Sequence, residues 1–123
     1  MDAEYLPEFG GTYLEDSYFM GMVCEGADLH VEMLFALTTD HPEYAPPLPG
    51  EQHCYRRGKL VFANPSASEI KPKRGASILR DPDGTLDLGS IELHRTTTGA
   101  ILVVTEWFEL TTTVSSLDVR LSS

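Results

Sequence analysis

The chain has 123 residues, of which 41% are hydrophobic, and this length and composition predict one globular β domain spanning residues 1–123. Nineteen acidic against nine basic residues give a formal charge of −10, which argues against a free-standing nucleic-acid binder because cationic side chains supply most of the affinity for phosphate. The same charge disfavours an anionic membrane surface, and no apolar run reaches the roughly 18 residues of a membrane span.

Segment 1–23 contains no Lys or Arg and no continuous apolar run of the length found in signal peptides. Only two cysteines, Cys24 and Cys54, are present, which is too few for a disulfide-stabilised scaffold. They can form one bridge or remain as two thiols, and thiols are the usual state inside the cell. The sequence therefore predicts a cytoplasmic protein with reduced cysteines.

An antiparallel hairpin is predicted in the first third of the chain. Residues 29–37 alternate as a half-buried strand does, residues 18–24 form its expected partner, and the short polar link 25–28 contains a glycine that suits a hairpin turn. Alternate positions of the second strand are apolar and share one face: Leu29, Val31, Met33, Phe35 and Leu37.

A third strand is predicted over residues 54–62, with Leu60 and Phe62 facing inward and Arg57 facing outward. Beyond it, the best helix candidate is the short segment 66–71, which lies between two prolines. No window of the chain shows a clear 3.6-residue period, so the predicted fold is built from strands.

The C-terminal third begins with a strong turn signal at 81–84, followed by a strand at 85–95 that is expected to kink near Gly89. A glycine-containing link at 96–99 then leads to residues 100–110, the most apolar segment, which is predicted to be one central strand.

Both faces of this predicted central strand are apolar. One face carries Leu102, Val104, Phe108 and Leu110, which we expect in the core, and the other carries Ile101, Val103 and Trp107. An apolar outer face needs a cover from a second sheet, a loop or another copy of the chain, so a homodimer is one prediction.

A last strand is expected to place Leu117, Val119 and Leu121 inward. Six strands with hairpin spacing predict an all-β fold, either an antiparallel sandwich or a small barrel of about six to eight strands. A long proline-rich loop at 38–53 separates the second strand from the third.

Charge is segregated along the chain. Residues 1–55 hold eleven acidic and no basic side chains, whereas residues 56–80 hold seven of the nine basic ones against a single acid, Glu69. The basic segment can pair with acidic neighbours across the sheet, or it can remain unpaired as an interaction surface. Because seven bases cannot neutralise nineteen acids, we expect a net acidic surface, which speeds association with a basic partner.

The sixteen-residue segment 38–53 holds four prolines and two histidines, and loops of this length are often functional. It is predicted either to cap one end of the sheet, with Tyr44 and Leu48 packed on the core, or to bind a partner. The candidate binding residues come from this loop, the strand after it and the apolar segment near the C-terminus: His41, Tyr44, His53, Tyr55, Arg57 and Trp107.

The sequence predicts no catalytic residue, no metal site and no cofactor. His41, His53 and Cys54 lack the ligand spacing of a zinc site, and adjacent residues of a strand point to opposite faces. Each cysteine is expected to behave as a small buried hydrophobe, and no nucleophile elbow, P-loop or dinucleotide motif occurs.

Segments 41–44 (HPEY), 46–52 (PPLPGEQ) and 54–62 (CYRRGKLVF) together resemble a group of small acidic bacterial proteins of unknown function, in which a similar loop leads into a similar strand. The resemblance covers residues 14–65. It implies that the loop at 41–55 is the signature region of that group, and it implies no activity, cofactor or partner.

These features favour a non-enzymatic protein-binding module that uses an acidic surface and the loop at 41–55. One version is an inhibitor of the immunity or antitoxin kind, which captures a basic toxin by electrostatic steering. The alternative is a small-molecule-binding β domain or an enzyme, with a pocket at the sheet end lined by Tyr44, His53, Tyr55 and Trp107.

Overall fold

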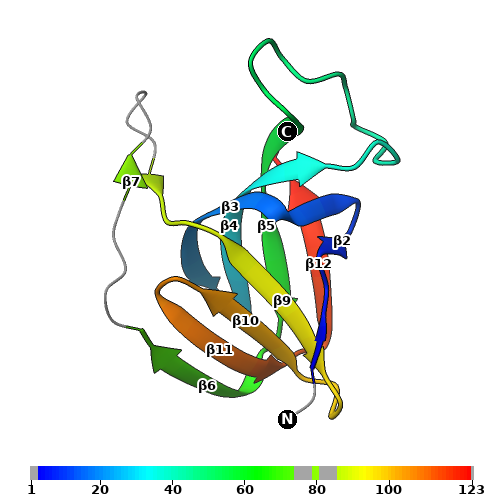
Figure 1. Cartoon of the computed structure of the whole chain (residues 1–123). Helices are drawn as coiled ribbons and strands as arrows, with labels where there is room; N and C mark the ends of the chain where they lie inside the picture. Colours follow the sequence, from blue (N-terminus) through cyan, green and yellow to red (C-terminus); the bar gives the residue numbers. More distant parts are fainter. Residues whose placement is uncertain (1–2, 74–78, 81–85, 123) are drawn as a thin grey trace.

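The structure is a computed structural model that describes residues 3–73, 79–80 and 86–122 of the chain (Figure 1). All regular secondary structure in these ranges is β-strand, which confirms the predicted all-β fold. The strands are β1 (Ala3–Tyr5), β2 (Glu8–Phe9), β3 (Thr12–Glu25), β4 (Asp28–Leu37), β5 (Cys54–Ala63), β6 (Ser66–Pro72), β7 (Leu79–Arg80), β8 (Leu86–Asp87), β9 (Ile91–Thr96), β10 (Ile101–Thr105), β11 (Phe108–Thr113) and β12 (Ser116–Leu121). None of the described residues forms a helix that is long and apolar enough to cross a membrane.

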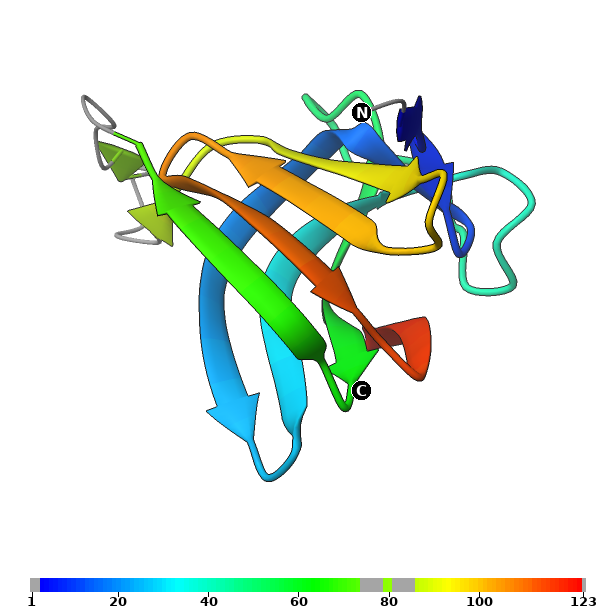
Figure 2. The same cartoon turned by 90° about the horizontal axis from the view of Figure 1, so that it is seen from below.

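Two antiparallel five-stranded sheets form the body of the described chain, and β7 pairs with β8 in a separate ladder. Sheet I has the order β1-β9-β10-β11-β6, and sheet II has the order β12-β5-β4-β3-β2. Short links carry the chain from β5 in sheet II to β6 in sheet I, and from β11 back to β12. Figure 2 shows β6, β10 and β11 crossing β3 and β4 at a steep angle, which is the arrangement of an orthogonal sandwich that approaches a closed barrel.

Sheet II is built around the predicted hairpin of β3 and β4, whose turn is closed by the pair Glu25 and Asp28. β3 begins at Thr12, earlier than predicted, and β4 pairs with β5 from Leu29 to Leu37. The apolar face predicted for β4 is confirmed, because every one of its members is buried: Leu29, Val31, Met33, Phe35 and Leu37.

One hydrophobic core fills the space between the sheets, and its largest fully buried side chains come from both of them: Leu14, Met33, Phe35, Leu60 and Phe62 from sheet II, and Ile91, Leu93, Ile101 and Val103 from sheet I. β12 lies close against β5 at Gly58. A Cβ atom there would collide with the carbonyl oxygen of Arg120 and crowd the ring of Phe35, so this glycine is required by the close approach of two strands.

Segment 100–110 is a hairpin, so the prediction of a single central strand is wrong. β10 ends at Thr105 and β11 begins at Phe108. The Thr105 hydroxyl accepts hydrogen bonds from the backbone N–H groups of Trp107 and Phe108, both at 3.1 Å, and thereby closes the turn without Gly or Pro.

The predicted faces of this segment are also wrong. Ile101 and Val103 lie in the core, each only 1% exposed, whereas Leu102 and Val104 are half-buried on the other face of sheet I. Leu110 is buried as predicted, because the turn restores its side chain to the core face. The homodimer prediction depends on an uncovered face that contains Ile101 and Val103. Because both side chains lie in the core, this face gives the prediction no support.

The helix candidate at 66–71 is wrong, because this segment lies in β6, an edge strand of sheet I that pairs with β11. Two hydrogen bonds tie the start of β6 to the end of β11. Ser66 Oγ lies 2.8 Å from Thr113 Oγ1, and the same threonine hydroxyl donates to the Ser66 carbonyl at 2.9 Å. Pairing with the neighbouring strand β11 thus overrides a weak local preference.

The strand predicted at 85–95 is divided into β8 and β9. The division falls at Gly89, whose φ of 94° lies in the left-handed region that L side chains rarely adopt. A kink was predicted at this residue, and the structure shows a complete break in the strand. The turn predicted at 81–84 lies outside the described residues.

Segment 38–53 contains no strand, as predicted, and it consists of an anchored base and an exposed arm at 45–52. In the base, the Thr38 N–H donates to the Gly11 carbonyl at 2.9 Å, and Tyr44 packs against the core. The predicted packing of Leu48 is wrong, because this side chain is 66% exposed. The base caps one end of the core, and the arm projects from it (Figure 1).

Candidate functional site

β3 carries a large bulge near its start. Between the pair Tyr13 and Ala36 and the pair Tyr18 and Leu34, β3 contains the four residues 14–17, whereas β4 contains a single residue. The extra residues cannot all join the ladder, so the strand bends there and turns its side chains in new directions. A bulge of this kind next to a hollow commonly positions a functional side chain.

The side chain of Ser17 holds the bulge in place. Its hydroxyl donates to the Tyr13 carbonyl at 2.6 Å and accepts from the Ala36 N–H at 2.9 Å, and the residue is only 1% exposed. Leu14 is turned fully into the core, while Asp16 remains exposed. One bridging hydroxyl therefore fixes where the Asp16 carboxylate stands.

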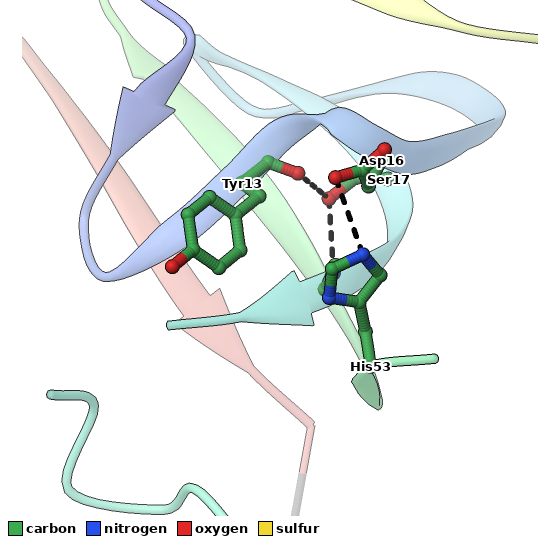
Figure 3. Close-up of polar contacts among 5 residues, drawn as sticks. Tyr13, Asp16, Ser17 and His53 are labelled. Atoms are coloured by element: carbon green, nitrogen blue, oxygen red, sulfur yellow. Dashed lines mark hydrogen bonds and ion pairs between the residues drawn. The ribbon is translucent and has the colours of Figure 1, made fainter. Parts of the chain in front are cut away.

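The Asp16 carboxylate contacts His53, the last residue before β5 (Figure 3). Its Oδ2 atom lies 3.2 Å from His53 Nε2. This contact is a hydrogen bond when the imidazole is neutral and an ion pair when it is protonated. It ties the end of the long loop to the bulge in β3.

Aromatic rings from the two strands β3 and β5 and from the loop gather around this contact. The His53 ring lies 5.8 Å from the ring of Tyr13 and 5.9 Å from that of Tyr55, which it meets edge to face at 86°. Tyr18 lies 5.9 Å from Tyr55 on its other side. These centroid separations are those of favourable aromatic pairs, so the rings support one another.

The side chains enclose a hollow of about 200 Å³ at the seam where β3 passes the start of β9. Its lining residues are Glu15, Asp16, Ser17, Tyr18, Gln52, His53, Tyr55, Gly89 and Ser90. Two carboxylates and three aromatic rings thus face one small space, and the described residues that line it include no Lys or Arg. We call this feature the acid–aromatic hollow.

Burial, together with the acidic surroundings, raises the pKa of two tyrosines. Partial burial raises the pKa of Tyr55 to about 12, with further contributions from the neighbouring Tyr18 hydroxyl and from the charges of Asp16 and Glu51. Burial also raises the pKa of Tyr5, whose hydroxyl donates to Glu15 at 3.4 Å. Both phenols therefore remain neutral hydrogen-bonding groups at physiological pH.

We expect Tyr55 to titrate about two pH units above a free tyrosine, which follows from its pKa of about 12 against 10.0. Because the folded-state pKa is the higher one, the neutral phenol stabilises the fold fully below pH 10, and that stabilisation is lost as the pH rises through about 12. Phenolate absorbance measured against pH tests this, with Tyr55→Phe as the control that removes the last step. A Tyr55→Phe protein whose titration above about pH 11 is unchanged would contradict the assignment.

Two of the six predicted binding residues, His53 and Tyr55, line the hollow. Tyr44 instead packs against the core at the base of the loop. His41 accepts the Glu43 N–H on its Nδ1 at 3.0 Å and lies over Gly11. These two side chains hold the loop on the body of the protein.

Trp107 lies at the β10–β11 turn, where it is half-buried against the core. Its indole N–H donates to the Leu88 carbonyl at 2.9 Å, so its polar atom has a structural partner. The predicted pocket grouping it with Tyr44, His53 and Tyr55 does not form, because only the last two line the acid–aromatic hollow.

Arg57 lies two residues beyond Tyr55 on β5 and lines a different hollow, together with Lys59 and Glu32. Glu32 is opposite Lys59 in the strand register, as the cross-strand alternative predicted. Among the described residues, however, neither Arg57 nor Lys59 has a carboxylate oxygen within 4.0 Å. Arg56 does form such a contact, at 3.3 Å with Glu43 of the loop. The basic strand is thus only partly paired within the chain.

The two cysteines are free thiols. Cys54 is buried as predicted, whereas Cys24 is exposed near the end of β3, so the prediction of a buried hydrophobe is wrong for Cys24. Cys24 is opposite Leu29 at one end of β4, and Cys54 is opposite Leu37 at the other, which separates them by roughly 25 Å at the usual rise of a strand. Disulfide geometry requires Cα atoms within about 7 Å, so a bridge between them is impossible in this fold.

Sequence reasoning missed Asp16, Ser17 and Tyr18, although all three line the hollow. They precede or begin the predicted strand 18–24, and nothing in their spacing indicates a bulge. The charge count alone pointed toward them, because the acid-only segment 1–55 contains both carboxylates of the hollow. The contact of Asp16 with His53 is a consequence of strand register and not of local sequence.

No group of three or more His, Cys, Asp or Glu side chains in the described part of the chain is arranged to hold a metal ion. Comparison of the sequence and structure with known proteins gave no match to a protein family, a curated protein or a solved structure.

Proposed function

We propose that the protein is a non-enzymatic module that binds a basic protein partner, and that the acid–aromatic hollow is part of the surface receiving it. The observation that carries the proposal is the lining of the hollow, where Glu15 and Asp16 lie beside the rings of Tyr18, His53 and Tyr55 and where none of the described lining residues is Lys or Arg. Carboxylates attract cationic side chains by charge-assisted hydrogen bonds, and aromatic faces attract them electrostatically.

The surroundings of the hollow strengthen this preference. The charge of Glu51 acts on Tyr55, and that of Glu92 acts on Tyr5, so further carboxylates surround the two that line the hollow. Gln52 belongs both to the exposed arm of the loop and to the lining, which makes the arm and the hollow one continuous surface. A net charge of −10 adds long-range attraction for a basic partner.

The size of the hollow supports a side chain as its occupant. Its volume of about 200 Å³ lies below the roughly 300–1,000 Å³ of sites that enclose a small molecule. The alternative of a metabolite-binding domain or an enzyme therefore has less support than protein binding. An immunity or antitoxin role is the specific form of the proposal in which the basic partner is a toxin.

The proposal places the protein in the cytoplasm, where the separated thiols of Cys24 and Cys54 remain reduced. Cell fractionation tests this location. Recovery of the native chain outside the cytoplasm would contradict it.

The test compares proteins captured from source cells by the wild type, by Glu15→Lys/Asp16→Lys and by the matched control Asp40→Lys/Asp118→Lys. The two double variants change the net charge equally, and the control carboxylates are exposed and lie outside the hollow. We expect the wild type and the control to retain a basic protein that the hollow variant loses. The association rate with that purified protein should fall at least about tenfold between low and high salt.

Two results would overturn the proposal. In the first, the hollow variant and the control lose the partner equally, which would make net charge and not the hollow responsible. In the second, the partner that depends on the hollow is not basic, or its association rate does not change with salt.

A further inference from the structure

The acid–aromatic hollow has the dimensions and chemistry of a receptor for one cationic side chain. Building on the proposed function, we propose that it binds a single arginine of the partner, with the guanidinium hydrogen-bonded to Asp16 and Glu15 and stacked against the tyrosine rings. Recognition of one arginine is more specific than the general attraction of an acidic surface for a basic protein.

The carboxylates have free hydrogen-bonding capacity in the direction of the solvent. Asp16 uses Oδ2 for His53 at 3.2 Å, and Glu15 uses Oε1 for the Tyr5 hydroxyl at 3.4 Å. Among the described residues, the second oxygen of each carboxylate has no hydrogen-bond partner. Asp16 and Glu15 can therefore accept N–H groups from an incoming cation without breaking the contacts that orient them.

The rings are fixed before any ligand arrives. The ring centroids of Tyr18 and Tyr55 lie 5.9 Å apart at an interplanar angle of 39°, and His53 supports Tyr55 from its edge at 5.9 Å. Tyr18 is 39% exposed, so a face of this pair is accessible to a planar group from solvent. An ordered, partly exposed ring loses little entropy when a ligand stacks on it.

Arginine matches this arrangement better than lysine does. A guanidinium is planar, carries five donors in a rigid fork, and is weakly hydrated, so it can stack on a ring while it donates to carboxylates beside it. An ammonium is a strongly hydrated point charge that gains most where it is fully enclosed. Here the carboxylates and Tyr18 are exposed, which leaves an ammonium largely in water and favours the flat cation.

The experiment is a titration of the full chain that is monitored by nuclear magnetic resonance. The signals observed are the backbone amides of Asp16, Ser17, Gln52, His53 and Ser90. The probes are the N-acetyl amides of arginine, lysine and citrulline. Citrulline keeps the shape of arginine but lacks its charge. We expect the arginine probe to bind in the millimolar range and about threefold or more tighter than the lysine probe, with no saturable shift for citrulline.

Variants separate the two halves of the site. Asp16→Asn removes the charge and Tyr18→Leu removes the stacking ring, and each should weaken arginine binding at least about threefold. Asp118→Asn and Met22→Leu are the matched controls, because Asp118 is an exposed carboxylate outside the hollow and Met22 on β3 is as exposed as Tyr18, at 39%. Both controls should bind the arginine probe as the wild type does.

Equal affinity for arginine and lysine, a response to citrulline, or shifts confined to residues outside the hollow would each overturn this inference. The first of these results leaves the basic-partner proposal intact if capture still depends on Glu15 and Asp16. Conversely, a specific arginine response together with a captured partner that ignores both carboxylates would support the arginine site and refute the proposed function.

Discussion

Replacing Phe62 by alanine should reduce the free energy of unfolding by about 3–5 kcal/mol, which is the range of the largest core truncations. Phe62 is fully buried on β5, where it is paired with Leu29 of β4 on one side and with Leu117 of β12 on the other. Truncation removes its apolar surface and leaves a cavity between two sheets that cannot collapse without disturbing both ladders. The total free energy of unfolding of a domain of this size is about 5–15 kcal/mol, so the variant should be close to unfolding.

Urea unfolding measured for three variants checks this expectation. Phe62→Leu keeps most of the volume and should cost less than about 1.5 kcal/mol. Leu48→Ala removes a side chain that is 66% exposed and should change stability by less than about 0.5 kcal/mol. Equal losses for Phe62→Ala and Leu48→Ala would show that Phe62 is not in the core.

The sequence predicts sheet II well because its strands alternate cleanly. The run from Leu29 to Leu37 has apolar residues at every second position, and a strand with this pattern has only one register that buries them. The same rule places Leu60 and Phe62 in the core, where both are fully buried. Period-two patterning thus determines these elements with no knowledge of their partners.

Sheet I is harder to predict because its apolar residues are continuous. Between Ile101 and Leu110 neither Gly nor Pro marks the turn, which is closed by the hydroxyl of Thr105. A side chain that bonds to nearby backbone groups can replace the usual turn residues. Without that information, an apolar run of this length fits one buried strand as well as it fits two.

In the candidate site, too, some residues can be identified from the local sequence and others only from the pairing of distant strands. His53 and Tyr55 are identifiable because they lie where a long loop enters a strand, a common place for binding residues. Asp16 and Tyr18 reach them through the pairing of β3 with β4 and of β4 with β5. The bulge that turns Asp16 outward depends on a hydrogen bond from a different strand, so no local pattern reveals it.

Ser17→Ala should lower the free energy of unfolding by about 1–3 kcal/mol and should also weaken the acid–aromatic hollow. The substitution removes the side-chain acceptor of the Ala36 N–H and the donor to the Tyr13 carbonyl, in a site that is 1% exposed. A buried N–H left without a partner costs most of its desolvation energy, and the strand relaxes to recover it. Because Asp16 is adjacent to Ser17 in the bulge, that relaxation should move the carboxylate away from His53.

Two measurements on Ser17→Ala separate the effect on stability from the effect on the site. Ser116→Ala is the control, because Ser116 is exposed and, among the described residues, only its backbone bonds to β5. Hydrogen exchange should become faster at the Ala36 amide in the Ser17 variant and remain unchanged in the control. The affinity of Ser17→Ala for the N-acetyl amide of arginine should also fall, because a stacked and bidentate contact tolerates little displacement of the Asp16 carboxylate. A Ser17→Ala protein that unfolds more easily but binds arginine normally would show that the bulge supports the fold without positioning the site.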